Sequence, residues 1–318
     1  MPEPERSSIA HSLALAAERL ARAGVLNAKR EATALWAALE GVKPGDVWLR
    51  RDGVPTPSQV ELFWKAVEQR ASGVPFPYAV GHAAFRSVGL KLDPRAAIPR
   101  PETEGLVELV LQWSAGKTGG LAADIGTGSG CIALSLAVEG RFDRVIAVER
   151  SPDAAALARE NVALIEPGTP VEVREGDLLA PLDARVRGKR GKRGKRGKAG
   201  KQGKRKRRQP ERYRVIVSNP PYLTETEYEA LDPTVRLFEP RAALVSGPDG
   251  LEATRALFAG AADRLEPGGV LCVEIDERRA EQVRLLAHEF GWRRIGIHQD
   301  LFGRPRYALA FPAATEDA

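Results

Sequence analysis

Residues 121–130 read LAADIGTGSG, an apolar run followed by three glycines that are separated by single residues. The run Leu121–Ile125 is typical of a buried strand, and the apolar segment 131–138 after the glycines is typical of a helix. Glycine lets the backbone approach a ligand closely, and a helix N-terminus supplies free N–H groups. On its own, this strand–turn–helix stretch predicts a site for a nucleotide-like ligand without specifying which one.

Strands and helices alternate from about residue 104 to the end of the chain, which predicts a parallel sheet with helices on both faces. The strands are expected at residues 121–125, 144–149, 171–174, 214–218, 269–275, 293–298 and 306–311. The main helices are expected at 131–138, 152–164, 251–265 and 280–290. Too few residues join the last two strands for a helical crossover, so we expect a hairpin and an antiparallel final strand.

The residues before this alternating region predict two further parts. Residues 1–75 carry apolar positions at helical spacing and a capping box with proline at Thr56-Pro57-Ser58-Gln59, so we expect a small helical domain that binds substrate. Residues 76–103 predict a linker with a β-hairpin, with strand pieces at 85–88 and 90–92. Residues 104–318 then form the α/β domain.

The net charge of +6 comes from one insert. Residues 185–208 hold 15 Lys and Arg and no acidic residue, so the rest of the chain carries 6 − 15 = −9. A repetitive Gly/Lys/Arg tract cannot bury apolar surface, and we expect it to be disordered. It is either a surface-loop expansion, which costs little stability, or a weak tether to RNA or the ribosome through phosphate neutralisation.

Length and composition exclude several classes of protein. The 318 residues suggest two domains, and a hydrophobic content of 43% is ordinary for a soluble protein. The start of the chain lacks the apolar core of a signal peptide, and no run reaches the length of a membrane span. The two cysteines, Cys131 and Cys272, have no metal-ligand spacing. We therefore expect a cytoplasmic enzyme with no metal and no membrane contact.

Three carboxylates at three successive predicted strand ends narrow the choice of ligand. The glycines run G-x-G-x-G, with Cys131 where the dinucleotide fingerprint has its third glycine. Asp124 suits an ammonium group better than a pyrophosphate, Glu149 can accept both hydroxyls of a ribose, and Asp177 can accept from an adenine amino group. Each acid alone is more often a loop or capping residue. Together they describe S-adenosylmethionine. The candidate cofactor-binding residues are Asp124, Gly126, Thr127, Gly128, Ser129, Gly130, Glu149, Asp177, Leu178 and Asn219.

Residues 214–222 read RVIVSNPPY, a strand that two prolines end abruptly because proline has no N–H to donate. Backbone carbonyls and the Asn219 carboxamide then project past the strand end, where ligands bind in open α/β sheets. An amide oxygen and a carbonyl oxygen make a pair of acceptors for an –NH2 group. The candidate catalytic residues are Asn219, Pro220 and Tyr222, and the candidate substrate-binding residues are these three with Pro221.

With these motifs the chain resembles the HemK/PrmC-type protein-(glutamine N5) methyltransferases, which modify peptide chain release factors. The matching segments are residues 98–104 (IPRPETE), 124–130, 219–222 (NPPY), 238–244 (FEPRAAL) and Asp300-x-x-Gly303-x-x-Arg306. The NPPY loop is shared with DNA adenine and rRNA guanine N-methyltransferases, whereas the segments 98–104 and 238–244 are more specific to the protein methylators. The resemblance implies a Rossmann-like seven-stranded S-adenosylmethionine-dependent methyltransferase sheet with an N-terminal helical bundle domain.

The resemblance also implies the reaction, which is methylation of the glutamine of the GGQ motif in release factors, and this tunes translation termination. The glutamine –NH2 would donate to the Asn219 side chain and the Pro220 carbonyl, and Tyr222 would pack on the substrate or in the core. The chain departs from the family pattern at Asp276 and Arg279, where glycine and glutamine are usual, and at Arg86, where an aromatic residue is usual. These departures lie away from the cofactor loop and concern substrate docking more than methyl transfer.

Two other functions compete with this one. The same loop could serve an N-methyltransferase that acts on an exocyclic amine of DNA adenine or rRNA guanine. The basic insert favours that reading, and the acidic remainder and the absence of an evident target-recognition domain count against it. A basic-tract RNA-binding protein on a decayed methyltransferase fold is the third reading. The intact glycines, acids and Asn219 argue against decay.

Overall fold

The computed structural model describes residues 8–183 and 210–313. Its main part is a seven-stranded sheet with the strand order β5-β4-β3-β6-β7-β9-β8. The strands are β3 (Leu121–Ile125), β4 (Arg144–Glu149), β5 (Val171–Glu175), β6 (Tyr213–Ser218), β7 (Leu265–Glu274), β8 (Arg294–Gln299) and β9 (Pro305–Phe311). The final strand β9 lies antiparallel between β7 and β8. The predicted sheet and its antiparallel final strand are confirmed.

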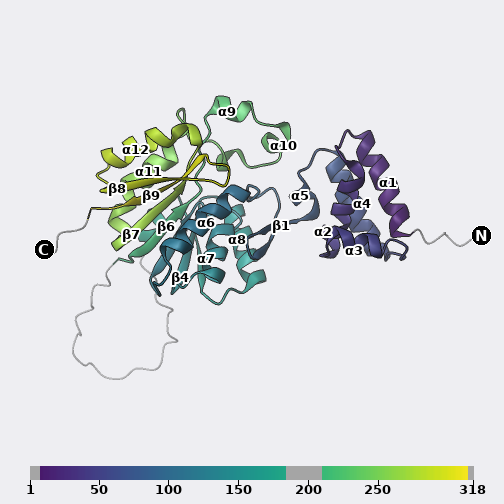
Figure 1. Cartoon of the computed structure of the whole chain (residues 1–318), viewed down its shortest axis with the longest axis horizontal. Helices are drawn as coiled ribbons and strands as arrows, with labels where there is room; N and C mark the ends of the chain where they lie inside the picture. Colours follow the sequence, from purple (N-terminus) through teal and green to yellow (C-terminus); the bar gives the residue numbers. More distant parts are fainter. Residues whose placement is uncertain (1–7, 184–209, 314–318) are drawn as a thin grey trace, which may run out of the picture.

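Helices cover both faces of the sheet (Figure 1). On one face α6 (Pro101–Trp113), α7 (Cys131–Glu139) and α8 (Pro152–Ile165) pack against residues such as Ala122 and Val215. On the other face α11 (Glu252–Gly260) and α12 (Ala280–Glu289) pack against the alternate residues, such as Ala123 and Ile216. Successive side chains of a strand point to opposite faces, so strands buried on both sides are apolar throughout.

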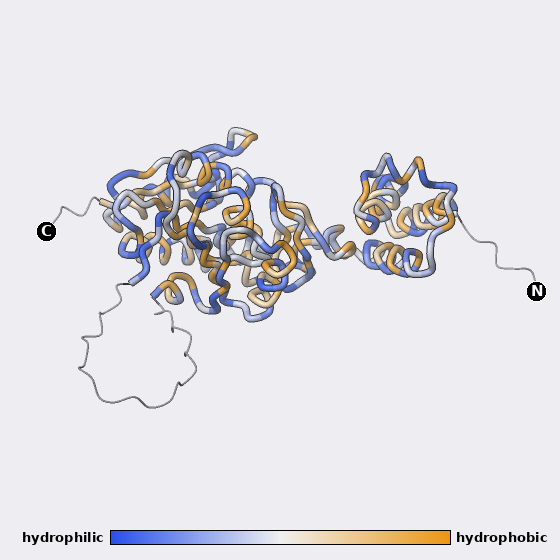
Figure 2. Tube along the Cα trace, turned by 90° about the horizontal axis from the view of Figure 1, so that it is seen from below, coloured by the Kyte–Doolittle hydropathy of each residue, from blue (hydrophilic) through white to orange (hydrophobic). Residues whose placement is uncertain are grey.

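The N-terminal helices form a bundle with its own core, and Figure 2 shows apolar positions gathered between these helices as well as inside the sheet domain. The helices are α1 (Ile9–Arg22), α2 (Ala28–Glu40), α3 (Pro44–Leu49), α4 (Pro57–Ala71) and α5 (Phe76–Val80). Trp36 and Phe63 meet edge to face, with ring centroids 4.7 Å apart. The capping box expected at Thr56 and Gln59 begins α4.

A two-stranded hairpin, β1 (His82–Phe85) and β2 (Val88–Lys91), follows the bundle. The expected hairpin is present, but the strand piece predicted at residues 85–88 is wrong. Arg86 has a φ of +50°, so it turns the chain instead of extending it. Its backbone N–H donates to Glu104 Oε1 at 3.0 Å and its guanidinium bonds to Glu139, and these contacts hold the turn.

Two other boundaries differ from the sequence prediction. The helix expected at 251–265 ends at Gly260, and a 3₁₀ turn (Ala262–Arg264) leads directly into β7. The strand β7 begins at Leu265 rather than at 269, because Leu265 pairs with Tyr213 across an irregular register. Two short helices, α9 (Glu225–Glu229) and α10 (Pro233–Arg236), follow β6, with 3₁₀ turns at Ala180–Asp183, Arg241–Ala243 and Glu277–Arg279 elsewhere. The basic tract 185–208 lies outside the described residues.

Candidate active site

The carboxyl ends of the parallel strands bring the predicted motifs to one edge of the sheet. Ile125 of β3 is paired with Ser218 of β6, and Ser218 is paired with Val273 of β7. On the other side, Ile125 is paired with Val148 of β4. The glycine turn, Glu149, Asn219 and the end of β7 are therefore neighbours, although they come from four separate parts of the chain.

The glycine turn is shaped by backbone hydrogen bonds and by left-handed residues. The N–H groups of Gly126 and Thr127 both donate to Val148 O at 2.9 Å, which bends the chain over the end of β4. Gly126, Gly128 and Gly130 have φ values of +73°, +55° and +88°, a region that favours glycine. A Cβ added to Gly126 would meet nothing within 4 Å, so open space lies above this residue. Thr127 and Ser129 are buried beneath the turn.

Asp124 lies under the turn with no solvent exposure. Its Oδ2 accepts from Thr127 Oγ1 at 2.5 Å and from Ala133 N at 3.1 Å, which ties the turn to the first residues of α7. Burial raises the pKa of this carboxyl to about 7. Its Oδ1 has no hydrogen-bond partner among the described residues. One oxygen therefore shapes the turn by holding Thr127 and Ala133, a role that sequence reasoning missed.

Glu149 lies half-buried at the end of β4, with both oxygens held by backbone amides. Gly128 N donates to Oε2 and Ser151 N donates to Oε1, each at 2.9 Å. A carboxylate oxygen has two lone pairs, so each can still accept a hydroxyl. The arrangement fixes the orientation of the carboxylate before a ligand arrives.

Asp177 is held less tightly than the other two acids. Gly176 N donates to Glu149 O at 2.9 Å, which brings this turn beside the end of β4. The Asp177 side chain is 64% exposed, and Arg150 is its nearest cation at 3.9 Å. Leu178, half-buried, has a φ of +47° and turns the chain after it. Asp177 and Leu178 remain predicted ligand contacts.

The Asn-Pro-Pro-Tyr loop is anchored at both ends. Ser218 Oγ donates to Ile125 O at 2.7 Å, and Leu223 exchanges two backbone hydrogen bonds with residues 244 and 246, at 2.9 and 2.8 Å. Pro220 is buried, while Pro221 and Tyr222 are half-buried. Burial raises the pKa of Tyr222 to about 12, so its hydroxyl stays protonated.

The Asn219 carboxamide is held by two residues that sequence reasoning did not place in the site. Asn219 Nδ2 donates to Thr103 Oγ1 at 2.9 Å, and Thr103 Oγ1 donates to Glu274 Oε2 at 2.8 Å. Thr103 comes from α6 and Glu274 is the last residue of β7, and both are buried. Two sequence signals could have placed them in the site: Thr103 lies within segment 98–104, and Glu274 lies at the end of a predicted strand.

The two segments that are most specific to the resembled family bind each other beside this loop. Glu239, whose side chain is 1% exposed, accepts from Ile98 N at 3.1 Å and from Arg100 Nη2 at 2.5 Å. The contact joins residues 98–104 to residues 238–244. The Asp300 motif shapes the turn between β8 and β9, because Asp300 Oδ1 accepts from Phe302 N and Arg304 N.

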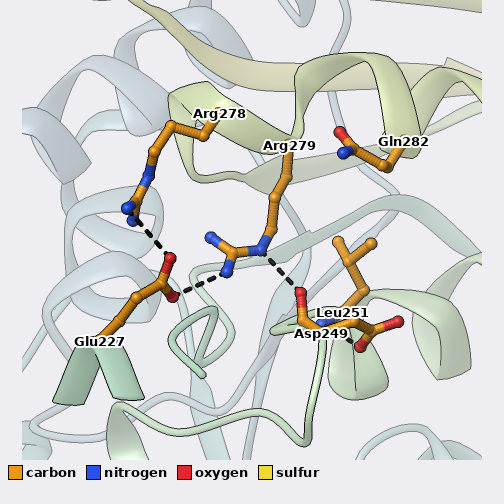
Figure 3. Close-up of a pocket in the computed structure, with 6 residues that line it drawn as sticks. All are labelled: Glu227, Asp249, Leu251, Arg278, Arg279 and Gln282. Carbon is orange, nitrogen blue, oxygen red and sulfur yellow. Dashed lines mark hydrogen bonds and ion pairs between the residues drawn. The ribbon is translucent and has the colours of Figure 1, made fainter. Parts of the chain in front are cut away.

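Of the two departures at Asp276 and Arg279, Arg279 lines a pocket of about 340 Å³ together with Glu227 and Asp249 (Figure 3). Arg279 is buried; it donates to Asp249 O at 2.8 Å and to Glu227 at 2.7 Å, and it lies 3.4 Å from Asp276. Arg278 also pairs with Glu227, at 3.0 Å. Glu227 belongs to α9, which follows the Asn-Pro-Pro-Tyr loop. The ion pair of Arg279 with Glu227 therefore ties the segment after this loop to the start of α12.

Arg86, the third departure from the family pattern, also forms ion pairs. Arg86 Nη2 lies 2.7 Å from Glu139 and 2.8 Å from Glu108, and its guanidinium is largely buried between them. The hydrogen bond from Arg86 lowers the pKa of both carboxyl groups. An ion cluster therefore fills the place where the family usually has an aromatic residue.

Across residues 8–183 and 210–313, no group of three or more His, Cys, Asp or Glu side chains could hold a metal ion. None of the helices described here is long and apolar enough to cross a membrane.

The family model "PrmC N-terminal domain" matches residues 11–81. A release factor glutamine methyltransferase of Moorella thermoacetica is 36% identical over 305 residues, covering 96% of this chain and 98% of the relative. The enzyme of the same name from Cereibacter sphaeroides is 35% identical over 306 residues, with coverages of 96% and 99%.

The chain belongs to the release factor glutamine methyltransferase family. Among solved structures, the catalytic domain of hMettl16 in complex with the MAT2A 3′UTR hairpin 6 superposes with a TM-score of 0.51 at 15% identity, covering 83% of this chain and 84% of that chain. At this identity the likeness concerns the fold alone. The Rossmann-like methyltransferase fold predicted from the sequence is confirmed, and so is the family.

Proposed function

We propose that this protein transfers a methyl group from S-adenosylmethionine to the side-chain amide nitrogen of the glutamine in the GGQ motif of peptide chain release factors. The observation that carries the proposal is the Asn219 carboxamide at the end of β6. Its Nδ2 is engaged by Thr103, so its Oδ1 is left as an acceptor for a substrate –NH2 group. The family membership supports the choice of a protein glutamine over a nucleobase.

The residues at the glycine turn fit S-adenosylmethionine. Open space above Gly126 leaves room for the ligand, and the unpaired Asp124 Oδ1 suits the ammonium of its methionine part. The oriented carboxylate of Glu149 suits the ribose hydroxyls, and Asp177 with Leu178 would contact the adenine. The remaining turn residues, Thr127, Gly128, Ser129 and Gly130, shape the cradle. When bound, the cofactor supplies an electrophilic methyl group.

The substrate side of the site works by positioning. We infer that the glutamine –NH2 donates to Asn219 Oδ1 and to the Pro220 carbonyl oxygen, which fixes the nitrogen in one orientation. The stiff Pro220-Pro221 backbone keeps the two acceptors in place, and Tyr222 packs against the substrate amide. Holding a weak nucleophile in a reactive geometry supplies a large part of the rate in such reactions.

The three predicted parts of the chain then have distinct roles. We assign residues 1–75 to binding of the release factor, 76–103 to the linker, and 104–318 to methyl transfer, with the whole protein acting in the cytoplasm. The tract 185–208, which lies outside the described residues, keeps its proposed weak contact with RNA or the ribosome. Deleting it tests that contact, because loss of ribosome association with an unchanged methylation rate is expected.

A transfer assay tests the proposed function. The protein is incubated with labelled S-adenosylmethionine and, separately, with a purified bacterial release factor, the same factor with its GGQ glutamine substituted, DNA and ribosomal RNA. We expect label on the intact release factor and none on the substituted one. Label on DNA adenine or rRNA guanine without label on the release factor would instead identify a nucleic-acid N-methyltransferase.

A further inference from the structure

The hydrogen bonds from Glu274 through Thr103 to Asn219 have a fixed direction. An ionised carboxylate only accepts hydrogen bonds, so Thr103 must give its single hydroxyl proton to Glu274 Oε2. The oxygen of Thr103 can then only accept from Asn219, which presents Nδ2 at 2.9 Å. Because the carboxamide has its nitrogen turned to Thr103, its oxygen faces the opposite way.

Protonation of Glu274 would remove this constraint. A protonated carboxyl group can donate to Thr103 Oγ1, and the Thr103 hydroxyl is then free to donate to the oxygen of Asn219. The carboxamide could turn over with no loss of hydrogen bonds and would present an –NH2 group to the substrate. Two –NH2 groups cannot bond to each other as donor and acceptor, so the turned state is unproductive.

The surroundings of Glu274 place this change near neutral pH. Its side chain is 1% exposed, and burial raises its pKa to about 7. Six charged or titratable groups surround it. They are Arg306 and Tyr307 of β9, Glu102 of α6, Arg100 just before α6, Cys131 of α7 and Tyr222 of the loop after β6. The two arginines favour the ionised carboxylate and Glu102 opposes it.

We propose that Thr103 and Glu274 are positioning residues that orient the Asn219 carboxamide, so that the site accepts an –NH2 group only while Glu274 is ionised. This inference rests on the proposed function for its catalytic consequence, but the orientation itself is a property of the free protein. Neither residue touches the substrate amide in this account. Both act through Asn219.

The catalytic test uses the full chain and a purified bacterial release factor. Thr103→Val removes the hydroxyl at nearly constant volume and is expected to lower kcat about 10²-fold, the scale of a misoriented reactive group. The Kd for S-adenosylmethionine should not change. Thr103→Ser keeps the hydroxyl and should restore most of the rate. Thr254→Val is the matched control, because Thr254 is equally buried on α11, on the opposite face of the sheet.

The pH profile separates this role from simple packing. In the wild type, kcat should fall with decreasing pH below about 7, the value to which burial raises the pKa of Glu274. Glu274→Gln cannot titrate, so this acid limb should disappear while the rate stays low at all pH values. An unchanged acid limb in Glu274→Gln would overturn the proposal and would point to Asp124, whose pKa burial also raises to about 7.

A spectroscopic test needs no substrate and distinguishes failure of this inference from failure of the proposed function. The chain has three asparagines, Asn27, Asn161 and Asn219, so ¹⁵N-asparagine labelling resolves the side-chain amides by NMR. The Asn219 signals should shift with a midpoint near pH 7 in the wild type and not in Glu274→Gln. The Asn161 amide, which bonds to backbone oxygens of Lys91 and Ser129, should not follow that titration.

The outcomes are separable. Titration of Asn219 in a protein that does not methylate the release factor would sink the proposed function and leave the orientation mechanism standing. Methylation that is unaffected by Thr103→Val, with Asn219 signals that do not titrate, would overturn the mechanism and leave the function standing. If Thr103→Val does not fold, Thr103→Ser and Glu274→Gln still decide the question through the pH profile and the NMR titration.

Discussion

Arg279→Gln restores the residue that the family usually carries at this position. It removes the ion pair with Glu227 at 2.7 Å, the contact with Asp276 at 3.4 Å and the hydrogen bond to Asp249 O at 2.8 Å. The side chain that is lost is largely buried, so water replaces little of what it contributed.

The expected loss follows from what remains. Removing one partner of a buried ion pair costs about 3–5 kcal/mol. Arg278 still lies 2.7 Å from Asp276 and 3.0 Å from Glu227, so neither carboxylate is left without a cation. We therefore expect a loss of about 3 kcal/mol in the free energy of unfolding for Arg279→Gln, at the low end of that range. In the double variant with Asp276→Asn, the carboxylate that lost its contact with Arg279 is gone as well, and a coupling of about 1–2 kcal/mol should be measured.

Urea denaturation followed by circular dichroism measures these values for the wild type, both single variants and the double variant. Arg255→Gln is the matched control, because Arg255 pairs with Asp249 at 2.7 Å on the surface. An exposed pair of this kind contributes about 0–1 kcal/mol. A coupling below about 0.5 kcal/mol between Asp276 and Arg279 would refute the reasoning, since independent sites add within that margin. The Km for the release factor is the second readout, because Glu227 lies just after the Asn-Pro-Pro-Tyr loop.

Three further predictions concern the cofactor cradle and Glu274. Gly126→Ala should raise the Kd for S-adenosylmethionine at least tenfold, because the added Cβ enters the open space proposed for the cofactor. Gly24→Ala is the control: Gly24 has a similar φ of +80° and equally open surroundings, and its substitution should leave this Kd unchanged. Glu149→Ala should raise the same Kd by about 10²-fold or more, because two hydroxyl contacts to a carboxylate are lost, with kcat at saturation nearly unchanged. Burial raises the pKa of Glu274 from 4.5 to about 7, so the folded state holds this proton more tightly than the unfolded state, and stability should fall as pH rises through that window. Glu274→Gln should reduce this pH-dependent loss of stability by roughly 3 kcal/mol.

Local patterns in the sequence predicted most of the fold. Apolar strands alternating with helices gave the parallel sheet, and the short connection before β9 gave its antiparallel direction. The turn at Arg86 was not predicted, because a left-handed arginine is stabilised by glutamates on two helices and not by its neighbours in sequence. The early end of α11 at Gly260 was missed because apolar spacing continues beyond it into β7.

The site was predicted only in part. The glycine turn and Asn219 were predicted because closely spaced glycines and two consecutive prolines are signals within a short stretch of sequence. Thr103 lies 116 residues from Asn219 and 171 residues from Glu274, and nothing local links the three. Their contact exists because the ends of β6 and β7 meet beside the start of α6. The role of Asp124 in holding the turn also depends on the position of the α7 N-terminus.

The most direct test of the central claim is mass spectrometry of the GGQ peptide from a release factor treated with this protein and S-adenosylmethionine. We expect one added methyl group, located on the side-chain nitrogen of the glutamine. We also expect Asn219→Ala to lower the rate of its appearance about 10²-fold or more at saturating cofactor. An unmodified glutamine after treatment with wild-type protein that binds the cofactor, or an unchanged rate in Asn219→Ala, would contradict it.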